Sequence, residues 1–267
     1  MHTVIEYVLV GTILLLILPL SQMSIASTVR YEENTMAQNM KYPAVRAVLN
    51  LLLLSPGYPS NWGDLTEEPE QLGLAHETAV EAKVLDVSKV MRLSFGSASY
   101  LEPSTAKRIL GLSPDCNFDL AIEPVFTIGI SNVSNNYGVT VTDNKGYRVG
   151  NVNITAYYIP NSYQSAQLYP SKTALTEVNG QCNLSFTWSA NHTLVVVANQ
   201  LEVKGLATLL SGVNVEVQNG CIFRTDYPAI QTIEYATGTP FGGSSEYAYS
   251  FAEIEGVTYF VRLLFWR

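Results

Sequence analysis

The stretch Val139–Ala156, which reads VTVTDNKGYRVGNVNITA, decides the fold of this chain. Valine and threonine alternate at its start, and apolar and polar residues alternate again over Val152–Ala156. Alternation with a period of two places the apolar side chains on one face of a β-strand. Between the two runs, Asp143–Gly146 is a strong turn signal. The stretch therefore predicts half-buried strands separated by a turn.

Strands of the same kind are predicted on both sides of this stretch. Upstream, Phe118–Ile130 is a long strand that is interrupted near Pro124. The strands predicted downstream are Thr173–Val178, Cys182–Trp188 and Leu194–Ala198. Short alternating strands that are separated by turns are typical of a β-sandwich.

The same residues carry a family resemblance. Val139–Ala156, together with TEVNGQCNLSF at Thr176–Phe186, resembles immunoglobulin-like modules of the carboxypeptidase-regulatory and bacterial Ig-like type. The resemblance covers Val139 to about Thr208. It implies a spacer or adhesive module that has no chemistry of its own.

The C-terminal part of the chain adds further strands. They are predicted at Val213–Gln218, Ile230–Tyr235, Tyr247–Phe251 and Val257–Trp266. We expect Phe118–Ile130 to pair with these strands, which makes the Ig-like module an insertion. The Gly-rich segment Gly238–Ser245 lacks the Gly-Lys-Ser/Thr ending of a phosphate-binding loop, so it is interpreted as a flexible connection.

The N-terminal region, Met1–Arg30, has a different character. No residue from Tyr7 to Val29 is charged, and an apolar stretch of about 20 residues is long enough to cross a bilayer as a helix. The sequence predicts a retained anchor that holds the rest of the chain outside the membrane. The alternative is a secretory signal that is cleaved after the small residues of Ser24–Ala26.

Two motifs resemble archaeal type IV pilin-like proteins. The segment TVIEY at Thr3–Tyr7 resembles the start of mature type IV pilins, and counted from His2, Glu6 is the fifth residue, where the pilin helix carries a glutamate. The segment LLLLSPGYPSNWG at Leu51–Gly63 resembles an elbow that follows the N-terminal helix in archaeal pilin-like, membrane-anchored proteins. The resemblance implies that Glu6 contacts the N-terminal amine of a neighbouring subunit and that the chain forms a homo-oligomer through this helix.

Helices are also predicted between the N-terminal region and the strands. Ala44–Leu54 has apolar residues at helical spacing and is stopped by Ser55-Pro56-Gly57. Pro103–Leu112 is predicted to be a helix, and Leu85–Leu93 a short helix or a strand.

Composition limits the classes of partner. The formal net charge is −8, which argues against binding nucleic acid through a basic patch. Only 14% of the residues are charged, and the chain holds 16 tyrosines and nine phenylalanines. This balance is typical of a β-rich extracellular protein rather than of a cytosolic helical enzyme.

The three cysteines are Cys116, Cys182 and Cys221. They form no Cys-x-x-Cys motif or Cys/His cluster, so no metal site is predicted. An exported chain can join two of them and leave one free; three pairings are possible, and Cys182 with Cys221 is the favoured one. The alternative is that all three are buried free thiols.

Four Asn-x-Ser/Thr sequons predict surface glycosylation. They lie at Asn132, Asn153, Asn183 and Asn191. The strand alternation places Asn153 and Asn183 on the faces opposite the apolar residues, where a glycan can project.

No catalytic residue is predicted. The three histidines belong to no metalloprotease motif, and no nucleophile elbow or phosphate-binding loop is present. A spatial triad that uses His76 is the weaker alternative. Glu253 and Glu255 share a strand face and are interpreted as solvent-facing. The alternation of Tyr247, Tyr249 and Phe251 fits either a sugar-stacking surface or the core face of a sheet.

The sequence as a whole predicts an α+β chain, in which a long N-terminal hydrophobic helix is followed by a mainly-β Ig-like sandwich. The predicted regions are 1–55 (helix and stem), 56–115 (a mixed linking region) and 116–267 (the β body, with the Ig-like module at about 137–208). The expected function is that of a pilin-like subunit at the cell membrane with its body outside. The alternative is a single-pass module that binds carbohydrate or protein without polymerising. The expected partners are the membrane, further copies of the chain, and surface glycans or cell-surface proteins. No cofactor, metal or nucleic acid is expected.

Overall fold

The structure, a computed structural model, describes residues 44–78, 83–133, 136–187, 191–210, 213–225, 227, 230–239 and 244–267. The chain divides into two compact units, Met1–Ala44 and Val45–Arg267. Every helix and strand described belongs to the second unit. The predicted N-terminal helix and Glu6 lie outside the described residues.

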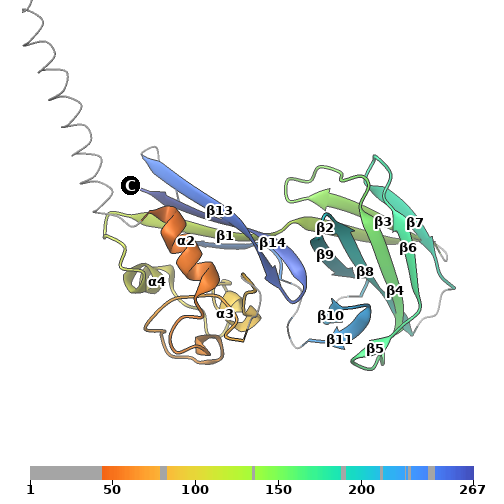
Figure 1. Cartoon of the computed structure of the whole chain (residues 1–267), viewed down its shortest axis with the longest axis horizontal. Helices are drawn as coiled ribbons and strands as arrows, with labels where there is room; N and C mark the ends of the chain where they lie inside the picture. The colour runs from red at the N-terminus through yellow and green to blue at the C-terminus, as the bar shows by residue number, and fades with distance from the viewer. Residues whose placement is uncertain are drawn as a thin grey trace, which may run out of the picture. The chain divides into compact units, whose positions relative to one another are not determined.

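One antiparallel sheet, the base sheet, has the strand order β12-β1-β14-β13 (Figure 1). Its strands are β1 (Asn117–Pro124), β12 (Ile233–Ala236), β13 (Ser245–Ile254) and β14 (Val257–Trp266). The hairpin between β13 and β14 turns through Glu255 and Gly256, whose φ angles of 48° and 75° suit a two-residue turn.

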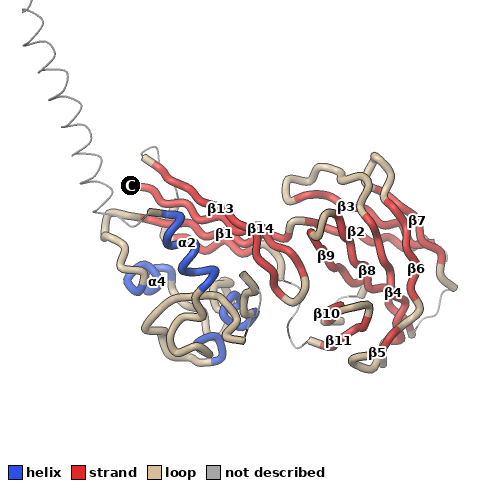
Figure 2. The backbone as a smooth tube through the Cα atoms, viewed as in Figure 1, coloured by secondary structure: helices blue, strands red, loops and turns tan. Residues whose placement is uncertain are grey.

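Short helices cover one face of the base sheet. They are α2 (Val45–Leu54), α3 (Val87–Met91) and α4 (Pro103–Ile109), with a 3₁₀ helix, η1, at Trp62–Asp64. Figure 1 shows α2 lying across the sheet, and Figure 2 shows the helices, in blue, gathered beside β1, β13 and β14. The apolar positions of α2 are buried because they repeat at helical spacing: Val45, Val48, Leu49, Leu52 and Leu53.

The predicted elbow is a compact crossing of backbone segments. Trp62 is fully buried, and its indole N–H donates to the carbonyl of Gly73 at 2.8 Å. A Cβ atom at Gly73 would lie 2.3 Å from the carbonyl oxygen of Ser55, so only glycine fits there. Lys89 is also fully buried and donates to the carbonyls of Pro56 and Ala75. These contacts hold the loop that follows α2 against the segment around Gly73 and Ala75.

The chain then forms a β-sandwich. One sheet has the order β2-β3-β7 and consists of β2 (Phe126–Val133), β3 (Asn136–Asp143) and β7 (Gln181–Ser185). The other has the order β6-β4-β8-β9 and consists of β4 (Asn153–Pro160), β6 (Ser171–Leu175), β8 (His192–Gln200) and β9 (Val203–Thr208). Their inner faces share one core, in which Val139, Val141 and Cys182 meet Ile154 and Val196. The alternation of Val139–Ala156 thus sets which face of β3 and of β4 is buried.

A small third sheet covers the second sandwich sheet. It has the order β10-β11-β5, with β5 at Gln167–Leu168, β10 at Val215–Gln218 and β11 at Cys221–Arg224. Val215 and Ile222 pack with Tyr157, Ile159 and Val195 from β4 and β8. Because both faces of β8 are covered, five of its nine residues are buried.

The predicted pairing of Phe118–Ile130 with the C-terminal strands is correct for its first half, β1, and wrong for its second half, β2. β1 pairs with β12 and β14, so Phe118–Pro124 does join the C-terminal strands. β2 pairs instead with β3 inside the sandwich. The chain changes sheet at Val125, next to Pro124, because proline has no N–H with which to continue a strand ladder.

Two predictions are wrong for the part of the chain that the structure describes. The fold class is mainly β rather than α+β with a long apolar helix, since the longest helix described, α2, has ten residues and stops before Pro56-Gly57. The predicted location, a single N-terminal span with the body outside the membrane, is corrected as well. No helix among the described residues is both long and apolar enough to cross a membrane.

Candidate functional site

Exposed aromatic side chains gather on the face of the base sheet opposite the helices. This surface, the aromatic face, consists of the exposed Tyr247, Tyr249 and Phe251 of β13 and the half-buried Phe260 of β14. Tyr247 is 67% exposed, Tyr249 62% and Phe251 52%. These three residues belong to β13, the edge strand of the base sheet, and their exposed fractions are large for aromatic side chains, so the aromatic face is a candidate binding surface.

The sequence of β13 produces this surface by inverting the usual pattern. The small residues Ala248 and Ala252 face the helices and are buried, and α2 packs against this strand. The large aromatic residues between them must then point to the open face. On β14 the pattern is the ordinary one, and Val261 and Leu263 fill the buried side. The prediction left two interpretations for Tyr247, Tyr249 and Phe251, and the structure places them outside the core.

The four rings form a continuous row. The rings of Tyr247 and Tyr249 are nearly parallel, with centroids 6.4 Å apart and planes 17° apart. Tyr249 contacts Phe260 at 5.7 Å, and Phe260 contacts Phe251 at 5.8 Å in an edge-on arrangement. Such contacts hold the rings in place before any ligand arrives.

The row ends at a cavity of about 630 Å³, which we call the polar cavity. Its lining includes Glu123, Asp143, Asn144, Lys145, Phe251, Phe260 and Arg262. The last residue of β3, Asp143, and the turn after it, with Asn144 and Lys145, line the cavity, so it combines residues of the sandwich with residues of the base sheet.

Hydrogen bonds fix several of these polar groups. The side-chain amide of Asn144 donates to a carboxylate oxygen of Glu123 at 2.7 Å. The carboxylate of Asp143 accepts from the backbone N–H groups of Lys145 and Tyr147, both at 2.9 Å, and thereby holds the turn. The ammonium group of Lys145 has no partner among the described residues and is available to a ligand.

Arg262 contributes a paired charge. Its guanidinium lies 3.2 Å from the carboxylate of Asp119 on the neighbouring strand. Burial raises the pKa of Asp119, and Arg262 opposes that rise. The polar cavity therefore carries both charge signs next to an aromatic floor.

The predicted glycosylation sites are all accessible. Asn132, Asn153, Asn183 and Asn191 are exposed. Asn153 and Asn183 lie on the strand faces opposite buried Ile154 and Cys182, as the alternation predicts. Glycosylation itself stays a prediction.

In the structure the predicted partners Cys182 and Cys221 are not joined. Cys116, Cys182 and Cys221 are all free thiols. Cys182 faces the sandwich core, whereas Cys221 begins β11 in the third sheet, so the two cysteines belong to different layers. Burial raises the pKa of the Cys116 and Cys182 thiols, which makes them poor nucleophiles.

The other candidate residues do not assemble into a reactive group. His76 bonds to Thr78 in its own loop, and the ring of His192 stacks on Tyr158 at 4.8 Å. Within the described residues, no three His, Cys, Asp or Glu side chains are placed to hold a metal ion. Glu255, predicted to face solvent with Glu253, is half-buried in the hairpin turn.

Sequence reasoning missed several members of the site. Phe260 and Arg262 belong to a strand that is hydrophobic overall, and Glu123 belongs to β1, which the sequence separates from β13 by more than 100 residues. Asn144 and Lys145 were recognised only as turn residues. The pairing of Phe260 with both Glu123 and Phe251 is what brings them together.

Comparison of the chain with protein-family models, curated proteins and solved structures gives no match. The resemblances to pilins and to Ig-like modules therefore remain predictions, and the functional argument depends on the geometry of the aromatic face.

Proposed function

We propose that this chain is a carbohydrate-binding protein without catalytic activity, and that the aromatic face with the polar cavity binds a neutral oligosaccharide. The observation that carries the proposal is the pair of exposed, nearly parallel rings of Tyr247 and Tyr249. Pyranose rings present faces of C–H groups with partial positive charge, and these pack against the electron-rich faces of aromatic rings.

The polar cavity supplies the second half of sugar recognition. A sugar that stacks on Phe251 or Phe260 brings its hydroxyl groups next to Glu123, Asn144 and Lys145. Carboxylate, amide and ammonium groups together provide both acceptors and donors for hydroxyls. Because the charges are mixed and Arg262 is already paired with Asp119, the site favours a neutral sugar over a strongly charged one.

The geometry favours a sugar over a protein partner. Aromatic side chains are also enriched in protein interfaces, but the fully buried centre of such an interface is depleted of charged groups. Here the charged residues Glu123, Lys145 and Arg262 lie directly beside Phe260, where they would be desolvated by a protein surface. A hydroxylated ligand keeps these groups hydrogen-bonded.

The test is binding of the full chain to an array of neutral oligosaccharides, followed by calorimetry on those that bind. Tyr249→Ala should weaken binding about tenfold, which corresponds to about 1.4 kcal/mol. Phe95→Ala is the matched control, because Phe95 is 88% exposed and lies outside the aromatic face. Binding that is equal in both variants, or no binding by the parent chain, would refute the proposal. Capture of a protein that depends on Tyr249 would show a protein-binding face instead.

The pilin-like function stays a prediction. It depends on Met1–Arg30 and Glu6, which lie outside the described residues. Substituting Glu6→Ala and comparing the self-assembly of the purified chain tests that hypothesis separately from sugar binding.

A further inference from the structure

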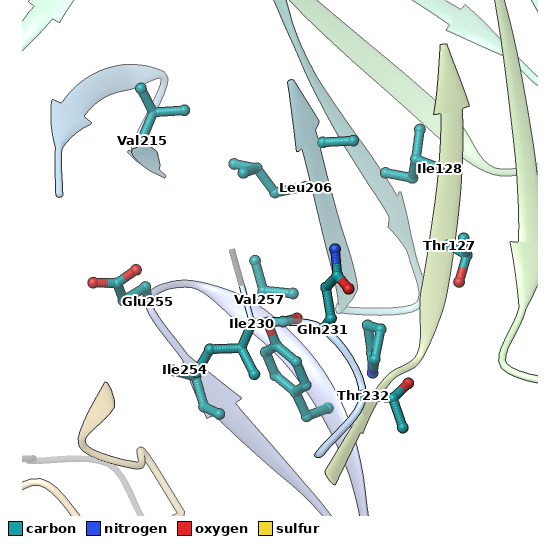
Figure 3. A pocket seen from close by; sticks show the side chains of 13 residues that line it. Thr127, Ile128, Leu206, Val215, Ile230, Gln231, Thr232, Ile254, Glu255 and Val257 are labelled. Carbon is teal, nitrogen blue, oxygen red and sulfur yellow. The ribbon is translucent and has the colours of Figure 1, made fainter. Parts of the chain in front are cut away.

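A second cavity, the hairpin cavity, lies at the tip of the β13–β14 hairpin and has a volume of about 400 Å³. Its walls are mainly apolar and include Ile128 of β2, Leu206 of β9, Val215 of β10, and Ile254 and Val257 beside the turn. Figure 3 shows these side chains around a common space. The volume falls in the range of small-molecule sites, about 300–1,000 Å³.

One carboxylate lies in this apolar lining. Glu255 is at the tip of the hairpin, and Figure 3 shows it at one end of the space, beyond Ile254 and Val257. The hydroxyl of Thr225 donates to one of its carboxylate oxygens at 2.6 Å. The other oxygen has no hydrogen-bond partner among the described residues.

The surroundings of Glu255 leave its charge uncompensated. No lysine, arginine or histidine is among the described residues that line the hairpin cavity. The charged neighbour is Glu216 of β10, which is a second negative group. Glu216 lies against the hairpin turn, with Oε1 3.8 Å from where a Cβ would stand on Gly256. Burial raises the pKa of Glu255, the hydrogen bond from Thr225 opposes that rise, and the repulsion from Glu216 adds to it.

Glu255 also occupies an unfavourable backbone position. Its φ angle of 48° lies in the left-handed region, where glycine and asparagine are preferred in two-residue hairpin turns. A glutamate costs stability in that conformation, and the turn itself does not need a carboxylate.

We propose that the hairpin cavity binds a small organic cation, an amine that carries an apolar group. The apolar group would fill the space between Leu206, Val215 and Val257, and the ammonium would pair with the free carboxylate oxygen of Glu255. Gln231, whose side chain extends into the same space in Figure 3, supplies an additional amide group for hydrogen bonding. This site is separate from the aromatic face, and the proposal does not depend on sugar binding.

The test compares probes of equal shape and different charge. Calorimetry of the full chain with 2-phenylethylamine, as its ammonium ion, should show binding at least about tenfold tighter than with 2-phenylethanol, because charge-assisted hydrogen bonds are stronger than neutral ones. Phenylacetate should not bind. Equal affinity for the amine and the alcohol, or no binding of either, would overturn the proposal.

Variants identify the group responsible. Glu255→Gln should remove the preference for the amine and leave binding of the alcohol unchanged. Glu255→Asn should do the same while suiting the left-handed turn position, so that a folding defect in the first variant does not decide the result. Glu253→Gln is the matched control, since Glu253 does not line the cavity. If the amine preference persists in both Glu255 variants, or is lost equally in Glu253→Gln, the assignment is wrong.

Discussion

Replacing the buried Lys89 by methionine tests how the base sheet and its helices are held together. The side chain of Lys89 is 0% exposed, and its ammonium donates to the carbonyls of Pro56 and Ala75 at 3.0 and 2.8 Å. Asp86, which caps α3 by accepting from two backbone N–H groups, lies 4.0 Å from the same ammonium. Lys89 therefore joins the elbow, the segment at Ala75 and the start of α3.

The magnitude follows from these contacts. Two hydrogen bonds from a charged donor contribute about 1.5–3 kcal/mol each, so their loss costs about 3–6 kcal/mol. Methionine fills a similar volume and avoids the desolvation of a buried ammonium, which offsets part of that cost. We expect Lys89→Met to lower the free energy of unfolding by about 2–4 kcal/mol, after this offset.

Thermal unfolding of the full chain, followed by circular dichroism, measures this effect. For a unit of this size, a loss of about 2–4 kcal/mol lowers Tm by about 5–15 °C. Lys107→Met is the matched control, because Lys107 donates to a single carbonyl, that of Pro114, at the surface. If Lys89→Met changes Tm no more than Lys107→Met does, the interpretation of Lys89 as the joining residue is wrong.

The pH dependence supplies an independent check on Lys89. Burial lowers the pKa of this ammonium below its ordinary value of 10.5, and Asp86 opposes the shift. The unfolded state then binds the proton more tightly, so the contribution of this group to stability rises with pH between the lowered pKa and 10.5. The stability of Lys89→Met should therefore rise less with pH than that of the parent chain. Thermal unfolding of both proteins at a series of increasing pH values measures this difference.

Three further predictions concern buried tyrosines, thiols and sequons. The hydroxyl of Tyr235 has no partner among the described residues, so Tyr235→Phe should leave stability unchanged or raise it by up to about 1 kcal/mol. Tyr259→Phe should lower the free energy of unfolding by about 1 kcal/mol, because the hydroxyl of Tyr259 donates to the carbonyl of Ile230 at 3.0 Å. Chemical denaturation of both variants checks this contrast. Alkylation of the unfolded chain without reductant should modify all three cysteines, and a protected Cys182–Cys221 pair would contradict the free thiols. If the host glycosylates the sequons, intact mass should exceed the polypeptide mass, and a bare mass would exclude the modification.

Much of the β architecture could be predicted because side-chain alternation leaves a clear pattern. The runs around Val139 and Val152 became β3 and β4, and the last strand was predicted at the bounds that the structure gives, Val257–Trp266. The strands β5, β9 and β11 were missed. They are short, or in the case of β9 interrupted by Gly205, whose missing side chain lets the strand pack against Phe126. Apolar and polar residues do not alternate clearly in a strand whose packing depends on a glycine, because glycine has no side chain to place on either face.

The candidate site was less predictable, since alternation identifies two faces of a strand without saying which is buried. On β13 the large residues, such as Tyr249, are exposed to solvent. The small residues, such as Ala248, face α2 and are buried, because the helix packs against that side of the strand. Glu255 was assigned to a strand face by its spacing from Glu253, but the turn begins there and directs it toward the hairpin cavity. Both outcomes depend on contacts between segments that are distant in the sequence.

The most direct test of the central claim is calorimetric titration of the full chain and of Tyr249→Ala with a neutral oligosaccharide selected on the array. The account predicts binding by the parent chain that weakens about tenfold in Tyr249→Ala, with unchanged thermal stability because Tyr249 is 62% exposed. Equal affinity of the two proteins for the oligosaccharide would contradict the assignment of the aromatic face as the sugar-binding surface.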